Sequence, residues 1–270
     1  MKLGLIGCGK MGGALLEGVI KAKLVKASQV AVCDVHGPSA AALQKKHPGL
    51  KVLAGGVEVI KASDTVILAV KPKDMETLLR SAAENAGKKT EGVLFLSIAA
   101  GITLSHLQSW LEGVPRIIRV MPNTPAQIGL GYSAFARATG VADADAEVAR
   151  RILGAVGLVD EVDEKLLDAI TGLSGSGPAY VFTVIESLAY AGVLMGLGRD
   201  AALRAAAQTV AGAAQMVIQT GELPAKLRDA VTSPGGTTIA GLEQLEAHGL
   251  RNALIQAVRK ATERSRELGK

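Results

Sequence analysis

The chain has 270 residues, of which 49% are hydrophobic and 20% charged, so it is long enough for two domains and too apolar for a disordered protein. The net charge is +5, but the basic residues are dispersed and aromatic residues make up only 3%, which argues against a nucleic-acid partner. Two cysteines without a Cys-x-x-Cys spacing and four scattered histidines predict a reducing, cytoplasmic location and no metal site.

The first predicted element is an apolar strand, Leu3–Ile6, which runs into a glycine loop, Gly7–Gly12, with the spacing Gly-x-Gly-x-x-Gly. In such a loop the first glycine permits the turn, the second admits a pyrophosphate, and the third lets helix and strand pack closely. A second strand, residues 29–33, ends at Asp34, where a ribose hydroxyl would be bound. The alternative is a glycine-rich turn without a ligand, which this context disfavours.

Strands and helices keep alternating up to residue 125. The predicted strands are 52–53, 65–70, 93–97 and 116–121, and the predicted helices are 39–46, 57–62, 74–86 (with an aspartate cap, Asp74) and 103–111. Near-continuous apolar strands in such an alternation indicate an α/β fold, a Rossmann-like, doubly wound parallel sheet. Ligands bind such sheets at the carboxyl ends of the strands. The candidate cofactor-binding residues stand there: Ile6, Gly7, Gly9, Lys10, Met11, Gly12, Asp34, Gly56, Ala69, Val70, Lys71, Pro72, Ala99, Ala100 and Asn123.

Strand signals end within residues 158–162, and we place a domain boundary near Asp163. Residues 1–163 would form the dinucleotide-binding domain, and residues 164–270 an all-helical, substrate-binding and dimerisation domain. The predicted helices of the second domain are 166–173, 178–197, 200–220, 224–231, 238–247 and 250–268. A turn of small residues, Ser174–Tyr180, is expected between the first two.

Residues 179–198 are apolar and long enough to span a bilayer. Glu186 lies near the centre of this stretch, and lysine or arginine is missing from its N-terminal flank, so no membrane partner is expected. We interpret Glu186 as a structural, hydrogen-bonding carboxylate. The apolar helical surface as a whole predicts an extensive homodimer interface.

Near the C-terminus, Ser233–Thr238 reads as a glycine turn between two helices. Such a turn directs free backbone N–H groups and the positive end of a helix dipole at one point, which suits a carboxylate. The candidate substrate-binding residues are Ser233, Gly235, Gly236, Thr237 and Thr238. The alternative is an ordinary helix hairpin with a polar turn.

Five motifs occur in one order over nearly the whole chain: Gly7–Gly12, Ala69–Pro72, Met121–Pro125, Ser174–Tyr180 and Val231–Thr238. Together they resemble the pyrroline-5-carboxylate reductase family, the last enzymes of proline biosynthesis. The resemblance implies a Rossmann domain, a helical dimerisation domain, a carboxylate site on the Ser233–Thr238 turn and reduction of a cyclic imine by a nicotinamide. It also implies dimers, which many members assemble into rings.

The implied reaction transfers a hydride from NAD(P)H to the imine carbon of L-1-pyrroline-5-carboxylate and gives L-proline. The nitrogen needs a proton, because an iminium accepts hydride better than a neutral imine. The turn would hold the substrate carboxylate, and the hydroxyl of Thr238, the candidate catalytic residue, would reach the ring nitrogen. Alternatively, Thr238 only caps its helix.

The family resemblance implies NADPH, with NADH as the alternative. Asp34 would repel a 2′-phosphate, and Gly55–Gly56 stands where many members carry an asparagine. His36 and Lys45 would offset that repulsion if they lie near it. We therefore expect NADPH use with weaker discrimination than is usual in the family.

Two other functions remain to be compared. One is another two-domain Rossmann oxidoreductase, of the hydroxyacid dehydrogenase or imine reductase type; the dehydrogenases carry a catalytic lysine in the helical domain, and this chain has none between Lys165 and Lys226. The other is a non-enzymatic dinucleotide sensor or scaffold, which the fold alone does not exclude. A sensor would need no second anion site such as the Ser233–Thr238 turn.

Overall fold

The computed structural model describes residues 1–113 and 116–269. The described chain divides into two compact units. The first comprises Met1–Ser176 together with the chain from Lys260 onward, and the second is Gly177–Arg259. Each unit is described by itself below.

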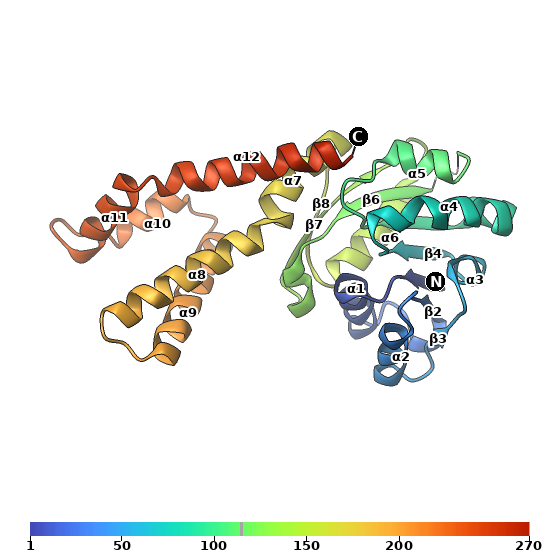
Figure 1. Ribbon diagram of the computed structural model, residues 1–270, viewed down its shortest axis with the longest axis horizontal. Coiled ribbons are helices and arrows are strands. Elements are labelled where there is room, and N and C mark those ends of the chain that lie inside the picture. Colours follow the sequence, from blue (N-terminus) through green and yellow to red (C-terminus); the bar gives the residue numbers. More distant parts are fainter. Residues whose placement is uncertain (114–115, 270) are drawn as a thin grey trace. The chain divides into compact units, whose positions relative to one another are not determined.

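A sheet forms the centre of the first unit (Figure 1). It has eight strands in the order β3-β2-β1-β4-β5-β6-β7-β8. The strands are β1 (Leu3–Ile6), β2 (Val30–Cys33), β3 (Lys51–Val52), β4 (Thr65–Leu68), β5 (Leu94–Ser97), β6 (Ile117–Met121), β7 (Gly131–Arg137) and β8 (Gly157–Glu161). Every residue of β1, β2, β4 and β5 is buried, as expected for strands covered on both faces. The predicted doubly wound α/β fold is confirmed, and β6 and β7 add an antiparallel pair to it.

Helices cover both faces of this sheet. They are α1 (Lys10–Lys21), α2 (Gly37–Lys46), α3 (Gly56–Ala62), α4 (Pro72–Ala86), α5 (Leu104–Trp110) and α6 (Asp143–Gly154). Right-handed crossovers put α1 and α2 on one face and α3, α4 and α5 on the other, because the strand order reverses beside β1. In agreement, α4 packs against both α3 and α5, whereas α1 packs against α6.

The predicted aspartate cap of the helix over 74–86 is wrong. Helix α4 begins two residues earlier, at Pro72, and its N-cap is Lys71, whose side chain makes no capping bond. Proline suits the first helical turn because its missing N–H would have no partner there. Asp74 lies inside this first turn, where its charge still favours the helix dipole.

The turn predicted at Ser174–Tyr180 is replaced by helical segments on both sides of a single bend at Ser176. A 3-10 turn (Glu164–Leu166) leads into α7 (Leu167–Ile170), then a π-helical segment (Thr171–Gly175), then α8 (Gly177–Leu194). The Ser176 N–H donates to the Thr171 carbonyl at 2.9 Å, which closes the wider π turn. A Cβ on Gly175 would overlap the Met121 methyl group, so the small residue here allows close packing on the end of β6.

The second unit is built from α8, α9 (Arg199–Thr220), α10 (Pro224–Ala230), α11 (Thr237–Ala247) and the first half of α12 (Leu250–Leu268). Helices α8 and α9 pack side by side as a hairpin (Figure 1). Within the described chain, α8 has no buried residue, and α9 buries only Ala202 and Ala206. A single copy of this unit therefore lacks a hydrophobic core of ordinary size.

Candidate active site

The glycine loop leaves β1 in a conformation that its three glycines make possible. Gly7 has φ +98°, and a Cβ there would lie 2.5 Å from the Ala69 carbonyl oxygen, so the ends of β1 and β4 touch. A Cβ on Gly12 would overlap the carbonyl oxygen of Gly7. A Cβ on Gly9, in contrast, would meet no atom within 4 Å, so this residue faces open space. The loop thus has no room for a side chain at its first and third glycines, whereas its second glycine has free space beside it.

This open position coincides with the start of α1. Gly9 is the N-cap, no side chain caps the helix, and the first helical bond runs from Gly13 N–H to the Gly9 carbonyl at 2.8 Å. The N–H groups of the first turn, at residues 10–12, therefore keep their bonding capacity. Free N–H groups, a helix dipole and a side-chain-free surface fit the pyrophosphate of a dinucleotide.

The other predicted cofactor residues lie at the same edge of the sheet. Asp34 follows β2, Gly56 opens α3 after β3, Ala69–Pro72 follow β4, Ala99 and Ala100 follow β5, and Asn123 follows β6. The strand order reverses between β1 and β4, and this is the position at which doubly wound sheets bind ligands. The structure brings these residues together, and their individual contacts with a cofactor stay predictions.

Asp34 makes contacts that the sequence does not reveal. One carboxylate oxygen accepts a hydrogen bond from the Cys8 N–H of the glycine loop, and the other accepts one from the His36 N–H at 2.7 Å. The half-buried carboxylate therefore fixes the glycine loop to the start of α2. Each oxygen retains a free lone pair for a further donor.

Both cysteines lie beside this carboxylate. Burial raises the pKa of Cys8 to about 12 and the pKa of Cys33 to about 11, and the Asp34 charge adds to both shifts. The two thiols are protonated at neutral pH, so neither suits a nucleophilic role. Within residues 1–113 and 116–269, no group of three His, Cys, Asp or Glu side chains is arranged to hold a metal ion.

Asn123 is engaged within the protein. Its amide nitrogen donates to the backbone and hydroxyl oxygens of Ser174, at 3.3 and 3.1 Å, and its amide oxygen accepts from the Tyr132 N–H at 2.9 Å. The side chain thus holds the end of β6 against the π-helical segment and β7. A cofactor would find only one free lone pair on its oxygen.

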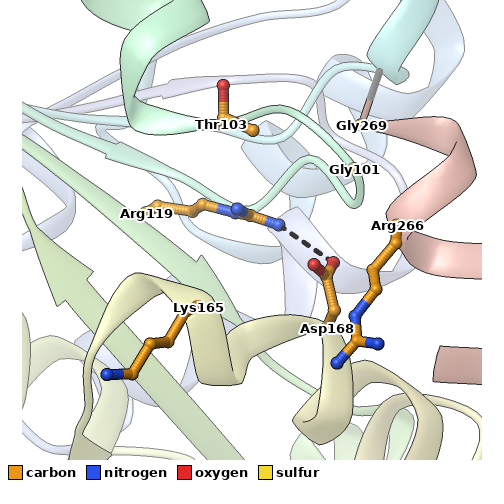
Figure 2. Close-up of a pocket in the computed structure, with 7 residues that line it drawn as sticks. All are labelled: Gly101, Thr103, Arg119, Lys165, Asp168, Arg266 and Gly269. Carbon is orange, nitrogen blue, oxygen red and sulfur yellow. Dashed lines mark ion pairs between the residues drawn. The ribbon is translucent and has the colours of Figure 1, made fainter. Parts of the chain in front are cut away.

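A pocket of about 420 Å³ lies near these loops, and none of the sequence motifs pointed to it (Figure 2). It is lined by Gly101, Thr103, Arg119, Lys165, Asp168, Arg266 and Gly269. Figure 2 shows Arg119 and Arg266 on either side of Asp168. The available signal was a single arginine inside the apolar strand β6.

Arg119 is the buried centre of that pocket, with a side chain only 7% exposed. It pairs with Glu164 at 3.0 Å and with Asp168 at 3.6 Å. The two carboxylates also accept hydrogen bonds from the Leu104 N–H and the Ser265 hydroxyl, each at 2.7 Å. Carboxylates thus neutralise Arg119, and the cluster fastens the end of α12 to the sheet unit.

In the second unit, the Ser233–Thr238 turn has the shape expected of an anion site. Gly235 has φ +66°, which favours glycine, and Gly236 is the N-cap of α11. A Cβ on Gly236 would overlap the Ser233 hydroxyl oxygen, so this hydroxyl lies over the turn. The first N–H groups of α11, at residues 237–239, point out of the helix start without an intrahelical acceptor.

The structure disfavours the interpretation of Thr238 as a helix cap. The cap position belongs to Gly236, and no side chain makes a capping bond there. Thr238 lies in the first turn of α11 and is half-buried, whereas Ser233 and Thr237 are exposed. Its hydroxyl is therefore not needed to begin the helix.

Two family descriptions match the chain. Residues 2–101 match "NADP oxidoreductase coenzyme F420-dependent", and residues 164–268 match "Pyrroline-5-carboxylate reductase dimerisation". The first match contains the glycine loop and the second contains the Ser233–Thr238 turn. The boundary proposed near Asp163 stays a prediction, since contacts within the chain divide the units at Ser176.

Full-length relatives share both halves. Pyrroline-5-carboxylate reductase from Methanosarcina acetivorans is 45% identical over 100% of this chain and 98% of its own length. Two solved reductase structures are each 32% identical and cover 100% of this chain and 98% of their own. The structure from Coxiella burnetii has a TM-score of 0.92, and the structure from Plasmodium falciparum, which has NADP bound, has a TM-score of 0.88. The chain therefore belongs to the pyrroline-5-carboxylate reductase family.

Proposed function

We propose that the chain reduces L-1-pyrroline-5-carboxylate to L-proline with hydride from NADPH or NADH, the last step of proline biosynthesis. The observation that carries the proposal is one chain with two helix starts, at Gly9 and at Gly236, whose backbone N–H groups no side chain caps. The first suits a dinucleotide and the second a small carboxylate. Identity of 45% over the full length supports the same conclusion.

The glycine loop, the start of α1 and the carboxyl edge of the sheet would hold the dinucleotide. When bound, its reduced nicotinamide supplies the hydride. The protein contributes a fixed binding surface: Gly7 and Gly12 hold the loop in shape, and Asp34 ties it to β2. Such preorganisation is what places the reacting groups at contact distance.

The Ser233–Thr238 turn would bind the substrate through its carboxylate. The N–H groups at the start of α11 and the Ser233 hydroxyl are the donors, and the helix dipole adds to their attraction. The Thr238 hydroxyl oxygen would accept a hydrogen bond from the N–H of the protonated ring nitrogen, whose bonding changes as hydride arrives. No titratable side chain lies within residues 230–242, apart from these hydroxyls, so the nitrogen enters as the iminium or draws its proton from solvent.

The assembly we propose is a cytoplasmic homodimer, with each active site built from two chains. It is supported by the exposed apolar surface of α8 and α9 and by the match of residues 164–268 to the family's dimerisation domain. The family resemblance extends this proposal to a ring of dimers, which a mass measurement in solution tests.

The decisive experiment adds pyrroline-5-carboxylate to the purified protein and NADPH or NADH, and follows nicotinamide absorbance and proline formation. We expect turnover with the carboxylate-bearing imine and poor turnover with 1-pyrroline, because the latter offers the turn no anion. Equal rates with both imines would favour a general imine reductase. Cofactor binding without turnover of any imine would favour a sensor and overturn the proposal.

A further inference from the structure

Asp34 occupies a fixed position at the carboxyl end of β2. Its two oxygens accept from the N–H groups of Cys8 and His36, so the carboxylate cannot swing away without losing both bonds. Val35, the next residue, is fully exposed, so the chain here opens to solvent. In a doubly wound sheet this is the place at which the adenosine ribose of a dinucleotide lies.

The lysines of the helix that follows Asp34 stand at the far end of that helix. Between residues 34 and 44 the only basic side chain is His36. Lys45 and Lys46 lie in the last turn of α2, about 12 Å along the helix axis from its start. Lys46 is moreover paired with Glu17 at 2.6 Å.

We infer that Asp34 determines cofactor choice in this chain and allows NADH to compete with NADPH. The inference deepens the proposed function and rests on it. The free lone pairs of the fixed carboxylate accept hydrogen bonds from the ribose hydroxyls of NADH. The 2′-phosphate of NADPH meets the same negative charge, and the two lysines of α2 stand at the far end of that helix, so we expect the dissociation constants of the two cofactors to lie within about tenfold of each other.

The test is equilibrium binding of NADPH and NADH by titration calorimetry, without substrate, to the wild type and three variants. Asp34→Ser removes the charge, and Asp34→Asn removes it while keeping an acceptor oxygen. Asp64→Asn is the matched control: Asp64 also accepts a backbone N–H, from Lys2 at 2.8 Å, but precedes β4 at the opposite edge of the sheet.

We expect Asp34→Ser to tighten NADPH and weaken NADH, shifting the ratio of their dissociation constants roughly tenfold or more toward NADPH. Asp34→Asn should shift it in the same direction and Asp64→Asn should leave it unchanged. An unchanged ratio, or an equal loss of both cofactors, would overturn the inference, because Asp34 would then only hold the glycine loop. If Asp34→Ser does not fold, the ratio in Asp34→Asn decides.

These measurements require no turnover. A wild type that binds both cofactors but reduces no imine would refute the proposed function and leave the inference about Asp34 standing.

Discussion

At the scale of single residues, the Ser233–Thr238 turn offers two hydroxyls with different expected effects. Thr238→Ala keeps the backbone N–H groups of α11 and removes the contact with the ring nitrogen. We therefore expect kcat to fall about ten- to hundredfold, which corresponds to an activation free energy raised by about 1–3 kcal/mol, and KM to rise less than kcat falls. Ser233→Ala should mainly raise KM. Thr238→Ser should retain most activity. Steady-state kinetics of the three variants tests this assignment.

Melting temperature is the control for these variants. Gly236 is the N-cap of α11, so Thr238→Ala should melt close to the wild type. A variant that melts several degrees lower but turns over normally would show that Thr238 serves the helix and not the reaction, contrary to the assignment.

The two buried thiols give a prediction about pH. Their pKa values, about 12 for Cys8 and about 11 for Cys33, lie above the ordinary 9.0, so the folded state retains protons that the unfolded chain releases. Their contribution to stability is complete below pH 9. It is lost as the pH rises from 9 toward 12, at about 1 kcal/mol per pH unit for each thiol.

Urea unfolding at pH 7, 9 and 10.5 checks this pH dependence. The wild type should lose more free energy of unfolding between pH 9 and 10.5 than a Cys8→Ala/Cys33→Ala variant, in which all other titrating groups are unchanged. Parallel losses in the two proteins would contradict it.

At the scale of elements, the glycine loop predicts opposite behaviour for two glycines of one motif. A Cβ on Gly9 meets open space, so Gly9→Ala should fold normally yet place a methyl group where the pyrophosphate binds. A Cβ on Gly12 meets the backbone oxygen of Gly7, which cannot move freely, so Gly12→Ala should lose both stability and cofactor binding. Thermal melting and cofactor titration of both variants separate the two effects.

The matched control is Gly154→Ala, at the exposed end of α6, where a Cβ also meets open space. It should bind cofactor like the wild type. Normal cofactor affinity in Gly9→Ala would show that the dinucleotide does not lie against the loop.

Elements with strong local signals were predictable, and elements set by distant contacts were not. The buried parallel strands and the glycine loop follow from apolar runs and spacing, because these patterns are local. Residues 131–154, for which no element is predicted, form β7 and α6. β7 is defined by antiparallel pairing with β6, and the π-helical segment by close packing on Met121, and neither contact is local in the sequence.

The candidate active site also combines features that the sequence predicts with features that depend on distant contacts. The residues at strand ends could be named because topology places them together. The bonds of Asp34 to Cys8 and of Asn123 to Ser174 could not, because they depend on how two distant loops meet.

At the scale of the whole molecule, the apolar helices need a cover that a single chain does not supply. Residues 164–194 are long and apolar enough to cross a bilayer by length and composition, and only 6% of their most apolar window is buried. The family match describes this region as a dimerisation domain, so we expect a second copy to cover it. Ile218→Asp, at a position 63% exposed on α9, should then produce monomers and lower activity.

Light scattering at micromolar concentration measures this effect. The control is Ile128→Asp, equally apolar and more exposed, outside residues 164–268, which should leave the dimer intact. A wild type that is monomeric and fully active would refute the obligate dimer.

If each active site combines the cofactor surface of one chain with the Ser233–Thr238 turn of another, two inactive variants should complement each other. A heterodimer of Thr238→Ala and Gly9→Ala chains, isolated with two different affinity tags, would contain one site with both defects and one with neither. Its activity should therefore recover to about half that of the wild type, since a twofold dimer has two sites. If each site belonged to one chain, both sites of the heterodimer would carry one defect, and the activity would stay at the level of the two variants.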